Sequence, residues 1–590
     1  MTPSIAEDGE HLSVRTAEYE LRWRIGDRGV TRSPYLELRD AGGERWTRLS
    51  ALSAVHTVDA RDETVSVGAP VVTRDGDVVV VEVPAVSTVW RQRRLVLRCT
   101  AEAVELRTDV IGEGRVSELV QFGGSARLPT GASGTFRSSI DARSLFVPTP
   151  TEPVAFVRPA AASAQLGIVG DADPGRVHGI FSPPPLVLAF GRRHPEGPTI
   201  PTGGPWLALS IRDHVDRLRF TSLRYEALDG GFTLNATYGG HTVVDGAWSS
   251  PAVVLRHVPE ALDAISFHRD DLIRHGYATE HRPDTVEWWR EPIFCGWGAQ
   301  VARGTAPAPE LSRQEVYDEL LGVLRDAELD PGTVVIDDRW QAAYGTADPD
   351  PGAWPDMRGW IADRHAEGRR VLLWWKAWDP TGLPAEECIL DGAGVPVAAD
   401  PGSAAYRARL TRIVERLLGP QGLDADGFKV DFTQRAPEGQ SFRSAPDSDG
   451  VWGIAALHRL VGDLHRAAKA IKPDALVITH TVHPSFAEVT DMVRTNDVLE
   501  RDVDGRAVGV VAQLGVRASI VGRALPHHLV DTDQWPMPDR SEWLAYAAAQ
   551  PGFGVPALYY VERIDEGELI TSEDLAFVGS TWAEYRRSLR

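Results

Sequence analysis

The segment Asp426-Gly427-Phe428-Lys429-Val430-Asp431-Phe432 places a lysine and an aspartate two residues apart in a short apolar run. Side chains two residues apart on a β-strand point to the same side, so we expect Lys429 and Asp431 to face one space. In a pocket, a neighbouring ammonium group would help to keep the carboxylate ionised, and an ionised carboxylate is the nucleophile that many glycosidases use. The same pair also fits a purely structural ion pair at a strand end. The residues that the other strands place beside it therefore decide between the two interpretations.

From about residue 285 onward, short apolar strands alternate with amphipathic helices. Tyr406, Leu410, Ile413 and Leu417 show the helical period of one such unit. Eight strand–helix units are typical of a (β/α)8 barrel, or TIM barrel. The strands are predicted at residues 292–296, 333–337, 370–375, 427–431, 475–479, 492–495, 519–522 and 556–560.

The first part of the chain has a different pattern. Segments such as 77–83, 94–99 and 104–110 alternate polar and apolar residues with a period of two and are separated by turn residues. The sequence therefore predicts a large antiparallel β-sandwich over residues 1–257, a helical linker over 258–284, and the barrel over 285–590. The fold class is multi-domain, with an all-β supersandwich before the TIM barrel.

Polar and aromatic side chains come at the ends of most of the predicted barrel strands. Active sites of such barrels lie at the carboxyl ends of the strands, so these residues are the candidates for a site. They are Trp297 after the first strand, Asp337, Asp338 and Trp340 after the second, Trp374 in the third, Lys429 and Asp431 in the fourth, His480 after the fifth, and Arg494 and Asp497 at and after the sixth.

The placement of tryptophan suits sugar recognition. Thirteen of the 18 tryptophans lie at or after Trp288. An indole stacks on the C–H face of a pyranose, while carboxylates, lysine and histidine bond its hydroxyls. We therefore predict that Trp340, Trp374 and Trp378 face a sugar, although packing between helices and barrel would also explain tryptophans here.

Two carboxylates across a pocket fit glycoside hydrolysis. Asp431 would attack the anomeric carbon, and Asp497 would protonate the leaving oxygen and later deprotonate water. That second role requires the pKa of Asp497 to be raised. Asp491 and Asp502 are close in sequence and are the alternatives for the acid.

Composition excludes several other classes of function. The 590 residues carry a net charge of −21, which argues against nucleic acid or an anionic membrane as partner. The chain shows no signal-peptide pattern and no apolar run near ~20 residues. Only three cysteines occur, far apart, and His480-Thr481-Val482-His483 lacks the ligand spacing typical of a metal site. We expect a cytoplasmic protein without metal or cofactor that binds a glycoside or oligosaccharide. The sequence leaves open whether the protein forms a homo-oligomer.

Four segments, in this order and spacing, resemble the melibiase, or α-galactosidase, clan of glycoside hydrolases and the related α-glucosidase-type families. The segments are Ile336-Asp337-Asp338-Arg339-Trp340, Trp354-Pro355-Asp356-Met357, Val371-Leu372-Leu373-Trp374 and Gly427-Phe428-Lys429-Val430-Asp431. The resemblance covers residues 285–590, and the first part is similar to the supersandwich of larger clan members in architecture only.

The resemblance implies roles for several residues. Asp431 would be the nucleophile, and Asp497, a few residues after Arg494, the acid/base. Asp337 and Asp338 would contact hydroxyls far from the anomeric carbon, Lys429 would also bind the sugar, and the anomeric configuration would be retained.

The chain also departs from the clan. Arg339 stands where members usually have glycine, Thr479-His480-Thr481-Val482-His483-Pro484 replaces a Cys and Gly-Gly segment, and the spacing from Arg494 to Asp497 is one residue shorter. These departures concern the sugar more than the chemistry. An α-transglycosylase, an α-glucosidase-type enzyme and a catalytically silent carbohydrate-binding protein are the alternatives, and the presence of both carboxylates argues against the silent protein.

Overall fold

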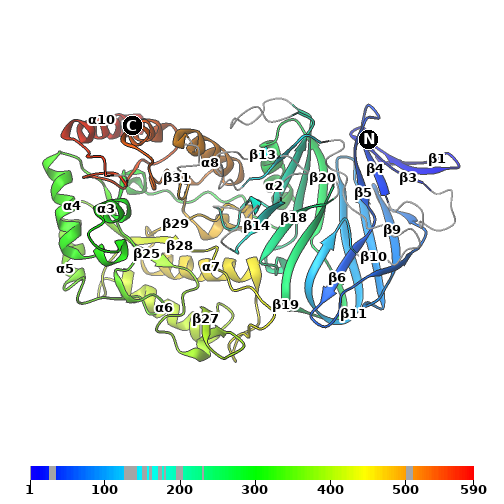
Figure 1. Cartoon of the computed structure of the whole chain (residues 1–590), viewed down its shortest axis with the longest axis horizontal. Helices are drawn as coiled ribbons and strands as arrows, with labels where there is room; N and C mark the ends of the chain where they lie inside the picture. The colour runs from blue at the N-terminus through cyan, green and yellow to red at the C-terminus, as the bar shows by residue number, and fades with distance from the viewer. Residues whose placement is uncertain are drawn as a thin grey trace.

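A computed structural model describes residues 2–590 apart from 25–34, 125–141, 149–155, 158–162, 170–175, 178–180, 194–203, 229–230, 500–508 and 566. It confirms the predicted fold class. An antiparallel β-rich region fills one end of the molecule, and a parallel eight-stranded barrel with helices outside it fills the other (Figure 1). In the described part of the chain, no helix combines the length and the apolar character that crossing a membrane requires.

Two sheets build the β-rich region. One is a five-stranded sheet in sequence order, and the other is a 15-stranded sheet built around the long antiparallel pair β11 (Val104–Gln121) and β19 (Gly231–Ser249). The first sheet comprises β1 (Ser4–Glu7), β2 (His11–Arg15), β3 (Tyr19–Arg24), β4 (Tyr35–Asp40) and β5 (Arg45–Ser50). The other strands of the second are β6 (Ser53–Thr57), β7 (Thr64–Val67), β8 (Val71–Asp75), β9 (Val78–Ser87), β10 (Gln92–Cys99), β12 (Ser144–Phe146), β13 (Phe156–Val157), β14 (Ser163–Gly167), β15 (Arg176–Val177), β16 (Val187–Gly191), β17 (Trp206–Arg212), β18 (Ser222–Leu228) and β20 (Ala252–Val258).

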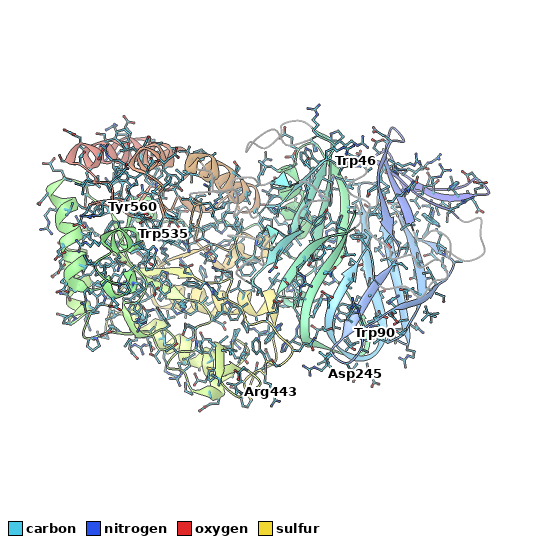
Figure 2. All side chains as sticks on the ribbon, viewed as in Figure 1. Trp46, Trp90, Asp245, Arg443, Trp535 and Tyr560 are labelled. Carbon is cyan, nitrogen blue, oxygen red and sulfur yellow. The ribbon has the colours of Figure 1, made fainter. Side chains whose placement is uncertain are left out.

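Alternating residues of these strands point inward and form the core. Trp46 and Trp90 lie in the sandwich, and Trp535 and Tyr560 lie in the barrel (Figure 2). Trp46, Trp90 and Tyr560 are buried, so each half has its own aromatic packing.

One helix lies between the two halves. Helix α2 (Asp263–Arg274) buries Ala264, Ile265, His268 and Leu272, a spacing that places them on one face. It packs on β16 and β17 of the sandwich and on α8 of the barrel. The predicted linker over residues 258–284 contains this helix.

The barrel strands are hydrogen-bonded in the order β31–β30–β29–β28–β25–β22–β21–β32. The gap between β31 and β32 is bridged where the Val555 amide donates to the Val530 carbonyl. The strands are β21 (Ile293–Cys295), β22 (Thr333–Ile336), β25 (Arg370–Lys376), β28 (Gly427–Asp431), β29 (Leu476–Thr479), β30 (Met492–Arg494), β31 (Leu529–Asp531) and β32 (Ala557–Leu558).

Helices and small hairpins connect these strands. The helices are α3 (Trp297–Arg303), α4 (Gln314–Asp326), α5 (Met357–Ala366), α6 (Ala404–Leu418), α7 (Gly453–Ile471), α8 (Val510–Ala524), α9 (Arg540–Ala549) and α10 (Ser572–Ser588). The hairpins are β23 (Gln341–Ala343) with β24 (Asp348–Pro349) and β26 (Cys388–Leu390) with β27 (Pro396–Ala399). Short 3-10 turns lie at η1 (Val215–Arg217), η2 (Glu287–Arg290), η3 (Ala308–Leu311), η4 (Ala385–Glu387), η5 (Pro484–Val489) and η6 (Gln550–Gly552).

The prediction of the seventh strand was wrong. Residues 519–522 lie inside α8, and the strand is β31, which begins at Leu529. Val510, Leu514, Arg517 and Val521 are buried with a helical period, so the apolar residues at 519–522 belong to a helix face. A strand of only three residues shows no periodicity of its own.

The sandwich contacts the barrel next to the carboxyl ends of β28 and β29. The Ser182 amide donates to the His480 carbonyl at 3.0 Å, and the Val482 amide donates to the Pro183 carbonyl at 2.9 Å. The Thr433 hydroxyl donates to the Ser182 carbonyl at 3.0 Å. The two halves are therefore joined beside the candidate site rather than at a distance from it.

The strand that carries Lys429 and Asp431 depends on a glycine at its start. Gly427 has a φ of +150°, and a Cβ there would lie 1.9 Å from the Leu476 carbonyl oxygen on β29. We expect Gly427→Ala to lower the free energy of unfolding by about 1–3 kcal/mol, because the two strands must separate. Gly322 of α4 has open space around it, so the control Gly322→Ala should raise stability by about 0.5–1 kcal/mol. Urea unfolding monitored by tryptophan fluorescence measures both, and an unchanged midpoint for Gly427→Ala would contradict the close strand contact.

Candidate active site

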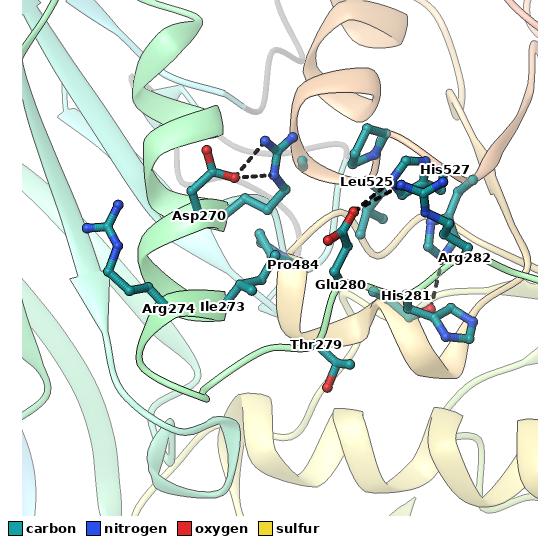
Figure 3. Close-up of a pocket in the computed structure, with 15 residues that line it drawn as sticks. Asp270, Ile273, Arg274, Thr279, Glu280, His281, Arg282, Pro484, Leu525 and His527 are labelled. Atoms are coloured by element: carbon teal, nitrogen blue, oxygen red, sulfur yellow. Dashed lines mark hydrogen bonds and ion pairs between the residues drawn. The ribbon is translucent and has the colours of Figure 1, made fainter.

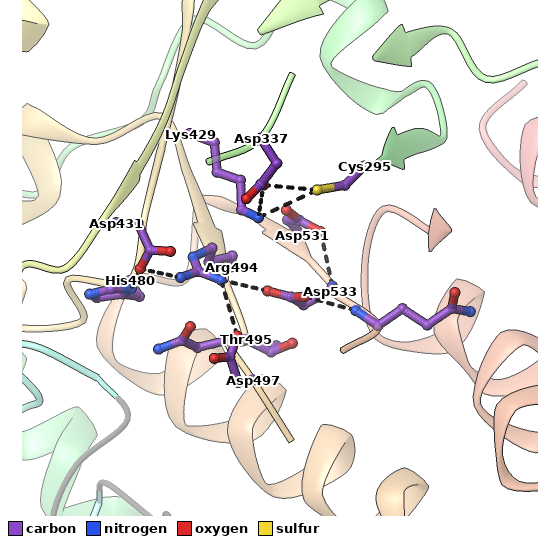
Figure 4. Close-up of polar contacts among 12 residues, drawn as sticks. Cys295, Asp337, Lys429, Asp431, His480, Arg494, Thr495, Asp497, Asp531 and Asp533 are labelled. Atoms are coloured by element: carbon purple, nitrogen blue, oxygen red, sulfur yellow. Dashed lines mark hydrogen bonds and ion pairs between the residues drawn. The ribbon is translucent and has the colours of Figure 1, made fainter. Parts of the chain in front are cut away.

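Carboxylates and cations from several strands meet at the carboxyl face of the barrel (Figure 4). They come from the ends of β22, β28, β30 and β31 and from the loops after these strands. The members are Asp337, Lys429, Asp431, Arg494, Asp497, Asp531 and Asp533, with Cys295 and His480 beside them. The structure thus brings together the residues that the sequence placed at separate strand ends.

The Arg494 guanidinium lies at the centre of this cluster. Its Nη2 donates to Asp431 Oδ1 at 2.6 Å, and its Nη1 donates to Asp533 Oδ2 at 2.8 Å. The same Nη1 lies 3.7 Å from Asp497 Oδ1. The side chain is 2% exposed. A planar guanidinium offers several donors in a fixed geometry, so one side chain fixes three carboxylates on three segments.

Asp431 is held as an ionised, oriented carboxylate. Besides Arg494, the Trp374 indole N–H donates to Oδ2 at 3.1 Å and the Phe432 amide donates to Oδ1 at 2.8 Å. Burial alone would raise the pKa of Asp431, but the charge of Arg494 overcomes burial and holds this pKa well below its usual range. The carboxylate is therefore charged at any ordinary pH and is fixed in direction.

Lys429 pairs with a different carboxylate from the one that its sequence position suggested. Its Nζ lies 2.7 Å from Asp337 Oδ2 and 3.5 Å from Cys295 Sγ. Lys429 does contribute at longer range to the lowered pKa of Asp431, as predicted, but the direct contact belongs to Arg494. The side chain is long enough to cross the barrel mouth from β28 to the end of β22, which sequence alternation along one strand does not reveal.

The pKa of Asp497 is shifted in the opposite direction from that of Asp431. Burial within the concave site raises the pKa of Asp497 to about 7, and the charges of Asp533 and Asp431 act in the same direction against Arg494. The side chain nevertheless keeps 45% of its surface exposed. Two carboxyl groups on one guanidinium thus differ in acidity, which is the arrangement that separates an acid from a nucleophile.

The loop that carries Asp497 is fixed from behind by Arg517 of α8. Its Nη1 donates to the carbonyl oxygens of Thr495 at 3.1 Å, Asn496 at 2.7 Å and Asp497 at 2.5 Å. Gln513, one helical turn before, donates to the Leu499 carbonyl and accepts from its amide. Arg517 was missed at the sequence level, where the only signal is a cation on the buried face of an apolar helical pattern.

His480 connects Asp431 to the sandwich. Its Nδ1 lies 3.9 Å from Asp431 Oδ1, and its Nε2 is hydrogen-bonded to the Thr433 hydroxyl. Burial lowers the pKa of His480 to about 3, so the imidazole is neutral. Because Thr433 gives its single proton to the Ser182 carbonyl, its oxygen accepts from Nε2–H. The imidazole orientation therefore depends on a backbone carbonyl of the sandwich.

The opposite side of the mouth carries Asp338 and aromatic rings. The Tyr344 hydroxyl donates to Asp338 Oδ1 at 2.7 Å. Burial raises the pKa of Asp338 to about 6, against the effect of that hydrogen bond. The Tyr344 and Trp374 ring centroids are 5.9 Å apart. Trp297 is half-buried and packs edge to face on Trp535, with ring centroids 5.9 Å apart, so these two indoles form a further aromatic wall.

Two tryptophans predicted to face a sugar lie beneath the wall instead. Trp340 has 0% exposure and its indole N–H donates to the Trp374 carbonyl. Trp378 is buried and donates to the Thr433 carbonyl. Both indoles therefore donate to backbone carbonyls, one in β25 and one just after β28. Trp374 is buried as well, and the Asp431 contact makes it an orienting group.

The alternative acids are placed differently. Asp491 directly precedes β30, at the amino end of the barrel, and pairs with His465 at 3.2 Å and Lys469 at 2.8 Å. It is therefore outside the cluster around Arg494. Asp502 lies outside the described residues.

Asp531 and Asp533, which had no assigned role, do belong to the cluster, and a correctly placed seventh strand would have pointed to them.

The backbone is strained at the ends of several barrel strands. Positive φ values occur at non-glycine residues within three positions of a strand end: Arg339 (75°), Trp378 (70°), Phe432 (57°), Asn496 (65°) and Asp533 (51°). Such conformations cost about 1–3 kcal/mol each and concentrate at functional sites. In the described part of the chain, no group of three or more His, Cys, Asp and Glu side chains is arranged to hold a metal ion.

A concavity of about 450 Å³ lies away from the cluster around Arg494 (Figure 3). It is lined by α2, by residues 279–282, by Pro484 and Ala487, and by residues 524–528. His528 directly precedes β31, so this concavity is at the amino end of that strand. It is therefore separate from the cluster at the carboxyl ends.

Comparison with solved structures finds the same fold in sugar-processing enzymes. A family 31 sulfoquinovosidase from E. rectale, bound to an aza-sugar inhibitor, has a TM-score of 0.58 at 9% identity, over 99% of this chain and 82% of that one. A family 36 α-galactosidase from Geobacillus stearothermophilus has a TM-score of 0.53 at 12% identity, over 100% and 86%. An α-galactosidase from Thermus thermophilus, bound to stachyose, has a TM-score of 0.51 at 16% identity, over 87% and 99%.

No family model and no curated protein matches the sequence. The likeness to the solved structures is one of fold, because the identities are low. It extends over both halves of the chain, whereas the sequence motifs covered the barrel alone. The protein thus has the two-part fold, a β-rich region followed by a (β/α)8 barrel, of glycoside hydrolase families 31 and 36.

Proposed function

We propose that this protein is a retaining, exo-acting α-glycoside hydrolase, similar to α-galactosidases in its chemistry. Residues 285–590 carry the chemistry, with the sandwich over 1–257 and the linker over 258–284. One observation carries the proposal: the Arg494 guanidinium lies within 4 Å of three carboxyl groups, among which Asp431 has a strongly lowered pKa and Asp497 a pKa raised to about 7. The fold shared with two α-galactosidases and a sulfoquinovosidase supports it.

In the first step, Asp431 attacks the anomeric carbon while Asp497 gives its proton to the leaving oxygen. The bond to the aglycone breaks as the bond to the Asp431 carboxylate forms, and the aglycone departs as a neutral alcohol. Attack needs an ionised, aimed carboxylate, which Arg494, Trp374 and the Phe432 amide provide. Proton donation needs an acid with a pKa near the working pH, which Asp497 has.

In the second step, Asp497, now a carboxylate, takes a proton from water. The hydroxide attacks the same anomeric carbon, the Asp431 ester breaks, and both carboxyl groups return to their starting state. Two displacements leave the anomeric configuration unchanged. An α-transglycosylase would use the same residues, with a sugar hydroxyl in place of water, and analysis of the products separates the two reactions.

The sugar would be bound by the remaining members of the cluster. The Lys429–Asp337 pair and Asp338 offer a donor and acceptors for hydroxyls, and Trp297 with Trp535 offers an aromatic face. Removing a charge-assisted hydrogen bond of this kind costs about 1.5–3 kcal/mol. A catalytically silent sugar-binding protein would have no need for two carboxyl groups of opposite acidity, which disfavours that alternative.

Asp431→Ala should lower turnover of aryl α-glycosides by several powers of ten, because no covalent intermediate can form. Azide added to this variant should attack the vacated face and give a glycosyl azide of inverted configuration. With the parent protein, intact-mass measurement after a 2-fluoro glycoside should show one attached sugar, and peptide mapping should place it on Asp431. Parent-like turnover in the folded variant, or a sugar attached elsewhere, would remove Asp431 from the mechanism.

The pKa of Asp497 sets a pH dependence for the first step. Asp497 must be protonated to act as acid, and its pKa is raised to about 7, so kcat/KM for an alkyl glycoside should fall as pH rises through that value. An activated aryl glycoside needs no proton, so Asp497→Ala should spare its first step. Azide should then rescue the second step and give a glycosyl azide of retained configuration.

The matched control is Asp491→Asn, which changes the competing candidate at the amino end of β30. It should keep the alkaline limb of the pH profile and show no azide rescue. If Asp497→Ala instead loses activity equally on both types of glycoside, and azide rescues neither, Asp497 is not the acid/base.

A further inference from the structure

Three cations gather on the side of the mouth formed by the ends of β22, β25 and β28. The guanidinium carbon of Arg339 lies 5.9 Å from the Tyr344 ring centroid, and Lys376 Nζ lies 4.2 Å from the same centroid. Lys376 Nζ also lies 5.2 Å from the Phe432 centroid, and the Arg435 guanidinium carbon lies 5.3 Å from it. The cations therefore surround two aromatic rings that belong to the pocket wall.

These rings are next to the proposed nucleophile. Lys376 is the register partner of Asp431 across β25 and β28, so both project from the same level of the barrel. Tyr344 donates to Asp338, and Phe432 comes directly after Asp431 in the chain. Asp497 comes after β30, which is four strands away from β22 in the sheet. The cations thus lie opposite the proposed acid, on the side where the terminal sugar, and not its leaving group, would sit.

Arg339 has two unusual properties. Its φ is +75°, a conformation that glycine adopts freely and that costs a larger residue free energy. The side chain is exposed, and among the described residues no carboxylate lies within ion-pair distance of it. A strained residue whose cation has no carboxylate partner within the described protein is suited to meeting a charge on a ligand.

The remaining charges on this side do not cancel that cation. Lys376 pairs with Asp379 at 2.9 Å and keeps 26% of its side chain exposed. Asp338 directly precedes Arg339 in the chain, and burial raises the pKa of Asp338 to about 6, which lessens its repulsion of an anion at acidic pH. The net charge of the whole chain is −21, so attraction of an anion must come from these local groups.

We propose that Arg339, with Lys376, forms an anion-recognition subsite, and that the substrate is a glycoside whose terminal sugar carries a carboxylate, sulfate, sulfonate or phosphate group. The inference rests on the proposed function and names its substrate class. The planar Arg339 guanidinium bonds two oxygens of such a group at once, and Lys376 supplies a point charge beside it. All four anionic groups offer oxygens to these cations in the same way, and a comparison of substrates that carry each group distinguishes between them.

The test compares aryl α-glycosides that differ only in the charged group: a neutral galactoside and glucoside, the matching uronides, and the matching 6-sulfates, 6-sulfonates and 6-phosphates. For the parent protein, kcat/KM should favour at least one anionic member over its neutral partner by about tenfold or more, because a charged hydrogen bond is worth that much. The preference should shrink as salt is added.

Arg339→Gly removes the cation and suits the backbone conformation, so the variant should fold. It should lose most of the anionic preference, and Arg339→Lys should keep part of it. The control is Glu328→Gly, because Glu328 also has a positive φ, of 55°, and is exposed at the end of α4, away from the site. That control should leave all the rate ratios unchanged.

Calorimetric binding of galacturonate, glucose 6-phosphate and neutral galactose to the parent and to Arg339→Gly tests the subsite without catalysis. Tighter binding of one anionic sugar to the parent, lost in the variant, supports the inference even if no glycoside is hydrolysed, an outcome that would defeat only the proposed function. Hydrolysis without preference for any anionic member, together with equal binding by parent and variant, would overturn the subsite and leave the hydrolase intact.

Discussion

The Arg494 guanidinium is the interaction on which the site depends. Moving a charged side chain into the protein interior costs several kcal/mol unless its partners are close and well aligned, and Arg494 is almost wholly buried. Asp431 and Asp533 supply those partners at 2.6 and 2.8 Å, and Asp497 stands further away at 3.7 Å. The unequal distances matter, because the carboxylate in direct contact is stabilised as an anion while the distant one retains a proton more easily. The charge of Arg494 lowers the pKa of Asp431, and burial raises the pKa of Asp497 against that charge, so the two carboxyl groups have the unequal acidities that the proposed two-step displacement requires.

Support for this centre comes from outside the barrel strands. Arg517 fixes the carbonyl oxygens of residues 495–497 from α8, and the Ser182 carbonyl fixes Thr433 and, through it, His480. The contacts from Ser182 through Thr433 to His480 begin in the sandwich. The β-rich half therefore does more than pack against the barrel: one of its backbone carbonyls places the His480 proton on Nε2, so that the nitrogen nearer to Asp431, Nδ1, carries none.

Periodicity and order along the chain were sufficient to predict the barrel and many members of the site. Alternating strands and helices indicated the architecture, and the strand ends indicated Asp431, Asp497 and most of the cluster. Contacts between strands were not predictable in the same way. Lys429 reaches Asp337, and Arg494 reaches Asp431, across distances that depend on barrel geometry and side-chain length. The seventh strand was displaced because three residues carry no period, and the burial of Trp340 beneath Trp374 could not be separated from exposure at a strand end.

The two sides of the mouth differ in their contributions. Residues at the ends of β28, β30 and β31 hold Asp431 and Asp533 through short contacts with the buried Arg494, so a substitution there disturbs several partners at once. At the ends of β22 and β25, Asp338, Arg339 and Lys376 are more exposed, and Arg339 has no carboxylate partner among the described residues, so a substitution of Arg339 disturbs fewer partners. Under the two proposals, Arg339 affects which sugar is accepted and has no contact with Asp431 or Asp497, the carboxyl groups that would react with it.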